Sequence, residues 1–323
     1  METRVFGRTG WRIGEIGYGM WGMAGWTGCD DKESERALDL AFELGCNFFD
    51  TAWAYGQGKS EALLGAFLKR HPGGRVYVAT KIPPKNSIWP SRREFKLEDC
   101  FPEEHIVEYT DRSLKNLGVE TIDLQQFHVW EDGWAADERW RRAVERLKRE
   151  GKIKALGISV NRWEPDNCLE TLKTGLIDSV QVIYNIFDQA PEDALFPLCE
   201  RLNLGVIARV PFDEGALTGK LTRETTFPKE DWRSTYFVPE NLEASVERAE
   251  RLQPLVPAGM SLPELALRFI LANSAVSTTI PGMRRQEHVR DNLSCSDGRS
   301  LPASLLRELK RHRWDRKPAT WSH

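Results

Sequence analysis

The feature that most constrains the fold is an alternation of short apolar runs with longer amphipathic segments along almost the whole chain. The short runs predict strands, and apolar residues at three- and four-residue spacing predict helices between them. Eight such strand–helix pairs predict an α/β fold, a single (β/α)8 TIM barrel with parallel strands. An open doubly wound sheet remains the alternative, because periodicity does not show whether a sheet closes.

The predicted elements cover the chain without a linker or an internal repeat. Strands are expected at 16–20, 47–52, 76–82, 122–128, 155–160, 180–185, 205–210 and 277–281. Helices are expected from about 31, at 60–70, 102–117, 136–150, 165–174, 192–202, 240–255 and 262–273, from about 285, and at 303–313. An N-terminal β-hairpin is expected over 3–13, long connections over 83–101 and 211–239, extra C-terminal helices, and one domain over 1–323.

Composition excludes several classes of protein. The net charge is −3 and the cations form no stripe, which argues against nucleic acid as a partner. The six cysteines form no CxxC pair, so neither a zinc site nor a redox motif is predicted, and a reducing compartment is the simpler interpretation. No stretch approaches the ~18 apolar residues that a membrane span needs. A cytoplasmic protein without a metal is expected.

A glycine motif near the N-terminus imitates a Rossmann fingerprint. Residues 17–22 read GYGMWG and fit GxGxxG. A Rossmann fingerprint requires the third glycine to open a helix, whereas residues 24–28 have the composition of a loop. We therefore predict no Rossmann site here.

Polar residues stand where three neighbouring predicted strands end. Asp50 ends one strand and Tyr55 lies just beyond it, Lys81 ends the next, and His128 ends the third. Neighbouring parallel strands lie about 5 Å apart, so these side chains are expected to meet at one end of the sheet. Each has a structural alternative: Asp50 as a turn residue, Tyr55 as a loop aromatic and His128 as a core histidine. All four together favour a catalytic site.

These four residue types suit carbonyl reduction, which needs a hydride at carbon and a proton at oxygen. A Tyr hydroxyl with a pKa of about 10 is a poor acid near neutrality, but a nearby ammonium stabilises its phenolate. A carboxylate keeps that ammonium charged despite burial. A His can orient the carbonyl oxygen or relay its proton.

Residues 47–65, NFFDTAWAYGQGKSEALLG, resemble the signature of the aldo-keto reductases, and the likeness runs from residue 6 to residue 293. The resemblance implies reduction of an aldehyde or ketone by NADPH, less often NADH, without metal. The dinucleotide would lie extended across the strand ends. The family's roles would make Tyr55 the proton donor, Lys81 and Asp50 its tuning pair, and His128 the orienting group.

The resemblance also implies a set of cofactor-binding residues: Ser159, Asn161, Gln181, Arg209, Gly282, Arg284, Arg285, His288 and Asn292. Cations before a helix N-terminus form an anion site, so Arg284 and Arg285 predict a 2′-phosphate and NADP(H) ahead of NAD(H). The alternative is that both are solvent-exposed charges. His288 stands where many members carry Arg or Gln, which weakens the preference.

Two positions depart from the family pattern. Val160 separates Ser159 from Asn161, so Asn161 is expected to be displaced from the nicotinamide carboxamide. Arg209 replaces the aromatic residue that commonly stacks on the nicotinamide. A guanidinium is planar and can stack there, or it can bind an anionic substrate.

Aromatic residues follow or end several predicted strands. Trp21, Trp53, Trp89 and Trp130, with Trp163 beyond them, predict an aromatic wall around the substrate and favour apolar or aromatic carbonyl compounds. The alternative is that these residues only pack.

Two other functions remain open from the sequence. A regulatory barrel that binds the dinucleotide as a sensor, with little turnover, would keep the same fold, but four intact catalytic residues favour an enzyme. A barrel enzyme of different chemistry lacks a metal cluster or paired carboxylates in its support. The sequence predicts neither the physiological substrate nor the oligomeric state.

Overall fold

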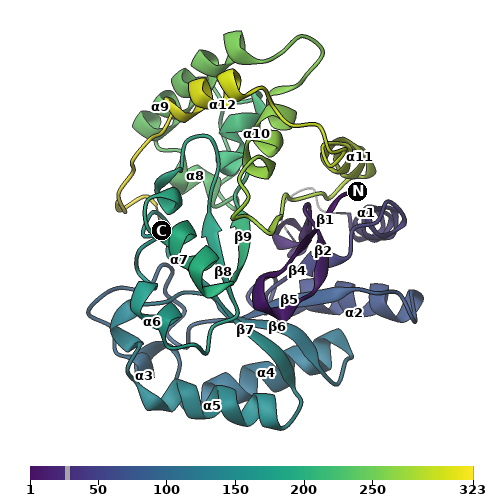
Figure 1. Ribbon diagram of the computed structural model, residues 1–323, viewed down its shortest axis with the longest axis vertical. Coiled ribbons are helices and arrows are strands. Elements are labelled where there is room, and N and C mark those ends of the chain that lie inside the picture. Colours follow the sequence, from purple (N-terminus) through teal and green to yellow (C-terminus); the bar gives the residue numbers. More distant parts are fainter. Residues whose placement is uncertain (26–29, 323) are drawn as a thin grey trace.

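Eight parallel strands form a curled sheet in the computed structural model, which describes residues 1–25 and 30–322 (Figure 1). Neighbouring strands pair in chain order from β3 to β10. Parallel bridges join Ile16 to Thr279 and Gly19 to Gly282, and the Gly17 N–H donates to the Thr279 carbonyl at 2.8 Å. These bridges connect the first strand with the last. The predicted (β/α)8 barrel is therefore confirmed, and the open doubly wound sheet is excluded.

The elements follow the predicted order. The strands are β1 Thr3–Val5, β2 Arg12–Gly14, β3 Tyr18–Gly19, β4 Phe48–Asp50, β5 Tyr77–Ile82, β6 Ile122–Phe127, β7 Ile153–Ser159, β8 Ser179–Ile183, β9 Gly205–Arg209 and β10 Thr278–Thr279. The helices are α1 Asp31–Glu43, α2 Lys59–Arg70, α3 Leu97–Cys100, α4 Glu103–Leu117, α5 Glu138–Arg149, α6 Leu169–Lys173, α7 Leu195–Leu202, α8 Arg233–Tyr236, α9 Pro239–Leu252, α10 Leu262–Leu271, α11 Gln286–Ser294 and α12 Ala303–Lys310.

Three segments differ from the sequence prediction. Short helices α3 and α8 interrupt the two long connections, where no helix was predicted. The helix predicted over 165–174 is reduced to α6, because the side chain of Asn167 bonds outside the segment. Its amide donates to Glu131 at 2.9 Å and its oxygen accepts from the Asp132 N–H at 2.9 Å.

The glycine motif at 17–22 does not open an α-helix. β3 leads into a 3-10 turn, Trp21–Met23, and α1 begins only at Asp31. Residues 26–29, part of the predicted loop, lie outside the described residues. The rejection of a Rossmann site is confirmed.

The N-terminal hairpin closes one end of the barrel. β1 and β2 pair antiparallel, and the turn between them places Phe6 against Phe48, with ring centroids 5.5 Å apart. Trp11 stacks on Tyr77 at 5.0 Å. Phe48, Tyr77 and Gly205 begin their strands. A side chain at Gly205 would place its Cβ 2.6 Å from the Phe6 ring, so the hairpin fits because Gly205 has none. Access to the barrel interior is left to the opposite end, where the strands finish.

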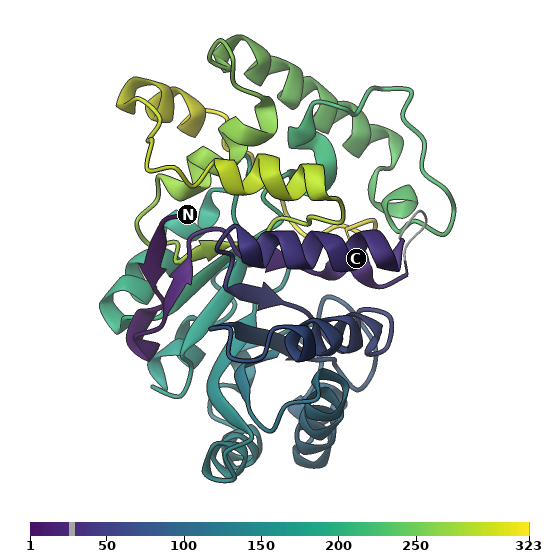
Figure 2. The same ribbon diagram turned by 90° about the vertical axis from the view of Figure 1, so that its right-hand side faces the viewer.

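Helices cover the outside of the sheet. Figures 1 and 2 show α1 and α11 side by side, with α4 and α5 at the far end of the molecule from α9, α10 and α12. One apolar cluster packed between sheet and helices includes residues from Ile16 to Leu309, and the single domain over 1–323 stays a prediction. No helix in the described chain is both long enough and apolar enough to pass through a membrane.

Candidate active site

Strand alternation places a polar layer above the apolar floor of the barrel. Successive residues of a strand point to opposite faces, so residues two apart share the interior. Inside the barrel, Phe48 is thus followed by Asp50, and Ala79 by Lys81. These four side chains are buried, and Asp50 ends β4. The polar layer therefore lies at the carboxyl ends of the strands, where barrel enzymes hold their active sites.

The Lys81 ammonium is the centre of this layer. It donates to a carboxylate oxygen of Asp50, to the Thr51 carbonyl at 2.8 Å and to the Tyr55 hydroxyl at 3.4 Å. Burial alone lowers the pKa of Lys81, but Asp50 and Tyr55 raise it more, so the pKa lies above the ordinary value. Lys81 therefore stays charged at the hydroxyl of Tyr55.

Asp50 is held in place by two glutamines from other strands. Its second oxygen accepts from the Gln126 amide at 3.0 Å and from the Gln181 amide at 2.8 Å. The amide nitrogen of Gln181 also bonds to Gln126, and the contact of Gln181 with the nicotinamide carboxamide stays a prediction. Gln126 was missed. Its position two residues before His128, on the inward face of β6, is the signal that would have identified it.

His128 follows β6 and lies against Tyr55. Their rings are 5.7 Å apart and nearly perpendicular, and Trp89 lies 5.8 Å from His128 in a similar edge-on arrangement. The buried Nδ1 of His128 has no hydrogen-bond partner among the described residues. Burial, then Lys81 and Arg209, holds the pKa of His128 well below its ordinary value. The imidazole is therefore neutral near pH 7.

Tyr55 is a protonated phenol in this setting. Burial raises its pKa, although the Lys81 charge partly opposes that shift. A neutral phenol that touches a fixed ammonium is an acid whose conjugate base is already stabilised. The structure thus brings together all four predicted catalytic residues, in an arrangement able to deliver a proton to a bound oxygen.

Next to this centre, β7 supplies two of the predicted cofactor residues. Ser159 is the last residue of β7, is buried and pairs in register with Gln181. Asn161 is also buried, but its amide donates to the Ser91 hydroxyl at 3.0 Å and to Glu131 at 2.9 Å. Its displacement from the strand-end contact agrees with the insertion of Val160.

Arg209 is the last residue of β9, and the other predicted cofactor residues lie after β10 and on α11. Gly282 bridges Gly19, and a Cβ added to Gly282 would meet nothing within 4 Å. The Arg284 side chain lies against Gly22, where an added Cβ would come within 2.8 Å of it. Arg285 is exposed and its guanidinium lies 3.4 Å from Glu287.

The first turn of α11 itself holds His288 and meets an acidic side chain from α1. Asn292, further along α11, is buried. Burial lowers the pKa of His288. The Gln286 N–H at the helix start donates to Glu33 at 3.1 Å. Glu33 was not predicted, because nothing in the sequence indicates that α1 and α11 are neighbours.

The predicted aromatic wall is only partly formed. Trp89 lies beside His128, and Trp21 packs edge-on against Trp232 at 6.0 Å. Trp53 packs on Tyr109 of α4 at 4.7 Å. The prediction for Trp130 is wrong.

Trp130 belongs to the core behind the site. It is fully buried, its ring lies 4.9 Å from Phe127 and 5.5 Å from Trp140, and its indole N–H donates to the Thr171 hydroxyl at 2.8 Å. Its aromatic and hydrogen-bonding surface is occupied by the protein itself, so it does not face a substrate.

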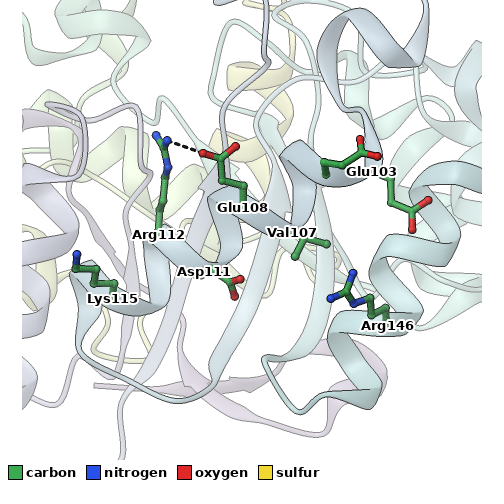
Figure 3. A pocket seen from close by; sticks show the side chains of 8 residues that line it. Glu103, Val107, Glu108, Asp111, Arg112, Lys115 and Arg146 are labelled. Atoms are coloured by element: carbon green, nitrogen blue, oxygen red, sulfur yellow. Dashed lines mark hydrogen bonds and ion pairs between the residues drawn. The ribbon is translucent and has the colours of Figure 1, made fainter.

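A large hollow lies elsewhere, between α4 and α5 on the outside of the barrel (Figure 3). Its volume is about 590 Å³ and its lining is mostly charged, including Glu108 and Arg112, which pair with each other. All its lining residues come from these two helices, away from the strand ends. It is a surface groove between neighbouring helices, away from the predicted catalytic residues. Across residues 1–25 and 30–322, no three His, Cys, Asp or Glu side chains are grouped to bind a metal.

Comparisons with known proteins agree with this fold and site. Residues 15–313 match the model of the Aldo/keto reductase family. The chain is 30% identical over 325 residues to the NADH-specific methylglyoxal reductase of Escherichia coli K12, covering 96% of this chain and 98% of that protein.

Two solved structures share the whole fold. Aldo-keto reductase AKR11C1 from Bacillus halodurans, in its holo form, matches with a TM-score of 0.78 and 26% identity over 100% of both chains. The glycerol dehydrogenase AKR11B4 from Gluconobacter oxydans matches with a TM-score of 0.80 and 29% identity, covering 96% of this chain and 94% of that one.

Four residues at the strand ends, Asp50, Tyr55, Lys81 and His128, are called the tetrad below. The barrel, the tetrad and these comparisons indicate an oxidoreductase that uses NAD(P)H on carbonyl compounds. The chain belongs to the aldo-keto reductase family.

Proposed function

We propose that this protein reduces small aldehydes or ketones to alcohols, with Tyr55 donating the proton to the carbonyl oxygen. The observation that carries the proposal is the buried Lys81 ammonium, which joins Asp50 to the Tyr55 hydroxyl. Reduced nicotinamide, when bound, supplies the hydride.

Each residue of the tetrad has a separate task in proton delivery. As the proton leaves Tyr55, negative charge develops on its oxygen beside the Lys81 ammonium, which stabilises it. Asp50 balances the charge of Lys81, so the cation is retained in a buried site. His128 is neutral and lies beside Tyr55, where its ring can donate a hydrogen bond that orients the carbonyl oxygen.

Residues beyond the tetrad are suited to binding the dinucleotide. The open surface at Gly282, the neighbouring cations Arg284 and Arg285, and the start of α11 together form an anion-binding end. Within this proposal, NADP(H) is preferred over NAD(H), because the two arginines suit a 2′-phosphate. The Glu33 carboxylate at the start of α11 opposes that preference, and the E. coli relative carries an NADH-specific name. Measuring kcat/KM for NADPH and NADH side by side decides the question.

A cytoplasmic location remains part of the proposal. Five cysteines of the described chain are free and buried: Cys46, Cys100, Cys168, Cys199 and Cys295. This state is typical of a reducing compartment.

The direct test follows reduced-nicotinamide absorbance with a panel of aldehydes and ketones, for the wild type and Tyr55→Phe. We expect the variant to lose about 10²- to 10⁴-fold in kcat and to keep its cofactor affinity, because it lacks only the donated proton. Tyr77→Phe, at the opposite end of the barrel, is the matched control and should retain full activity. Tight cofactor binding without turnover on any carbonyl compound would instead identify the sensor barrel.

A further inference from the structure

Arg209 carries a positive charge into the catalytic centre without a partner for it. It is the last residue of β9, and its Nη2 donates to the Val160 carbonyl at 3.0 Å. Its Nε is buried and makes no hydrogen bond within the described chain. The next residue, Val210, has φ +56°, which is unfavourable for a β-branched residue and shows that the surrounding fold holds this turn.

The guanidinium lies near the reacting groups. Burial has the largest effect on the pKa of both Tyr55 and His128. The positive charge of Arg209 lowers both pKa values, by less than that of Lys81 does. Arg209 itself has a pKa lowered to about 10, first by burial and then by repulsion from Arg162. At neutral pH it is still a cation. It stands two residues after Ile207, which lies in the inner apolar cluster of the barrel, so its side chain also points into the barrel at the strand ends.

The nearby carboxylates are already engaged by other cations. Glu214 pairs with Arg162 at 2.7 Å, and both side chains are largely buried. Asp213 pairs with Arg316 at 2.7 Å. Among the described residues, Arg209 has no ion pair of its own. A poorly solvated guanidinium without a counter-ion is costly unless a bound group supplies the negative charge.

The nicotinamide ring cannot supply that charge, because it is neutral when reduced and cationic when oxidised. Asp50 cannot either, since its oxygens are occupied by Lys81, Gln126 and Gln181. The free Nε–H and the unbonded N–H groups of the Arg209 guanidinium match the two oxygens of a carboxylate. A negative group on the substrate, a short distance from its carbonyl, therefore completes the site.

We propose that Arg209 binds a carboxylate carried by the substrate, so that the preferred substrates are short aldehydes or ketones bearing an acid group near the carbonyl. The inference rests on the proposed reductase function and deepens it. The acid group takes no part in the reaction: the carbonyl carbon gains the hydride and its oxygen gains the proton from Tyr55. Arg209 sets which carbonyl compounds are held for that transfer.

The test compares acids with their own methyl esters. Glyoxylate, succinic semialdehyde and 4-carboxybenzaldehyde are each assayed against the corresponding ester, with wild type, Arg209→Gln, Arg209→Lys and the exposed control Arg201→Gln. We expect the wild type to prefer at least one acid by about tenfold or more in kcat/KM. Arg209→Gln should lower the acid-to-ester ratio of kcat/KM by about tenfold, and Arg209→Lys should restore part of that ratio.

Three outcomes overturn the assignment. In the first, the wild type favours the esters throughout. In the second, Arg209→Gln leaves the acid-to-ester ratio of kcat/KM unchanged. In the third, Arg209→Gln changes kcat/KM equally for all substrates because it alters the affinity for the oxidised cofactor. Esters reduced without any preference for acids would refute only the role of Arg209, whereas no reduction of either would refute the reductase function itself.

A measurement on the wild type alone keeps the inference testable if the variants fail to fold. Benzoate should inhibit ester reduction competitively, whereas benzamide, of the same shape without charge, should inhibit at least about tenfold more weakly. Equal inhibition by the two compounds would contradict a carboxylate site.

Discussion

Among single residues, Lys81 shows how the fold tolerates a buried charge. Moving an ammonium out of water costs several kcal/mol, which only close acceptors offset. Lys81 finds three: Asp50, the Thr51 carbonyl and the Tyr55 hydroxyl. Gln126 and Gln181 in turn hold Asp50. The contacts that offset the burial of Lys81 also fix its charge beside Tyr55, the proposed proton donor, so we expect stability and catalysis to depend on the same atoms.

The protonation states of Tyr55 and His128 predict an asymmetric pH dependence. Burial raises the pKa of Tyr55 above 10.0 and lowers that of His128 below 6.5. Carbonyl reduction needs the protonated phenol, so its kcat/KM should stay nearly flat from about pH 6 to 9. Alcohol oxidation needs the phenolate, so its kcat/KM should rise with pH and still be rising near pH 10.

Steady-state rates in both directions across this range check the prediction, with cofactor kept saturating. A drop in reduction as the pH falls through about 6.5 would show that His128 titrates in the free enzyme, against its burial beside Lys81. A plateau in oxidation near pH 8 would show that Lys81 outweighs burial in setting the pKa of Tyr55.

At the level of elements, the position of each helix relative to its neighbour decides what its ends can bind. The amide groups at the N-terminus of α11 form a predicted phosphate site, but Glu33 of α1 already accepts from the Gln286 N–H. Glu33 also pairs with Arg36 at 2.8 Å. The packing of α1 against α11 thus places the Glu33 carboxylate at the predicted phosphate site. Its negative charge would repel a 2′-phosphate bound there.

Glu33→Gln should therefore increase the affinity for NADPH relative to NADH. Charge at a helix terminus is worth about 1 kcal/mol, so the ratio of the two dissociation constants should change roughly fivefold. Quenching of tryptophan fluorescence measures both constants. Glu43→Gln, at the other end of α1, is the control. An unchanged ratio in Glu33→Gln would place the adenosine end of the cofactor away from α11.

Close packing of α2 on α4 predicts a costly glycine replacement. Ala normally stabilises a helix interior relative to Gly by about 1 kcal/mol. A Cβ at Gly65 would instead lie 2.7 Å from the carbonyl oxygens of Asn116 and Leu117, so the helices must separate. We expect Gly65→Ala to lower the free energy of unfolding by about 1–3 kcal/mol in urea titrations. Gly133→Ala, with no atom within 4 Å of the added Cβ, should be nearly neutral; equal effects at both sites would refute the packing argument.

Over the whole molecule, the C-terminal segment connects loops that are distant in sequence. The side chain of Arg316 is only 3% exposed and pairs with Asp188 after β8 and with Asp213 after β9. Trp321 packs edge-on against Trp163, which follows β7, at 5.7 Å. Three loops at the active-site end of the barrel are therefore held by the last residues of the chain.

Replacing Arg316 should destabilise the protein strongly. Arg316→Leu would leave Asp188 and Asp213 buried close together without a counter-ion, and breaking such a pair costs about 3–5 kcal/mol. Denaturant titration measures the change, with Arg311→Ala as the control. Arg311, just after α12, is 75% exposed and pairs within the described residues with Glu308, so it should matter little. A loss for Arg316→Leu no larger than that of the control would show that the segment is not anchored.

Local patterns in the sequence determined the order of the elements and indicated the four proposed catalytic residues. Alternating side chains place Asp50 and Lys81 inside the barrel whatever surrounds them, and parallel strand order brings their ends together. Tyr55 lies just beyond the strand that Asp50 ends, and His128 directly follows β6. Strand-end spacing and family resemblance are therefore sufficient to predict the tetrad from the sequence.

Contacts between distant segments were decided only by the tertiary structure. The bond from Gln181 to Asp50, across 131 residues of sequence, was not predicted. Trp130 was predicted to line the substrate site, yet it is buried in the core, where its ring packs on Phe127 and Trp140 and its N–H donates to Thr171. Glu33 accepts from the Gln286 N–H, and Arg316 pairs with Asp188 and Asp213, all far apart in sequence. Burial and pairing depend on what the closed barrel brings near, and no local pattern of residues contains that information.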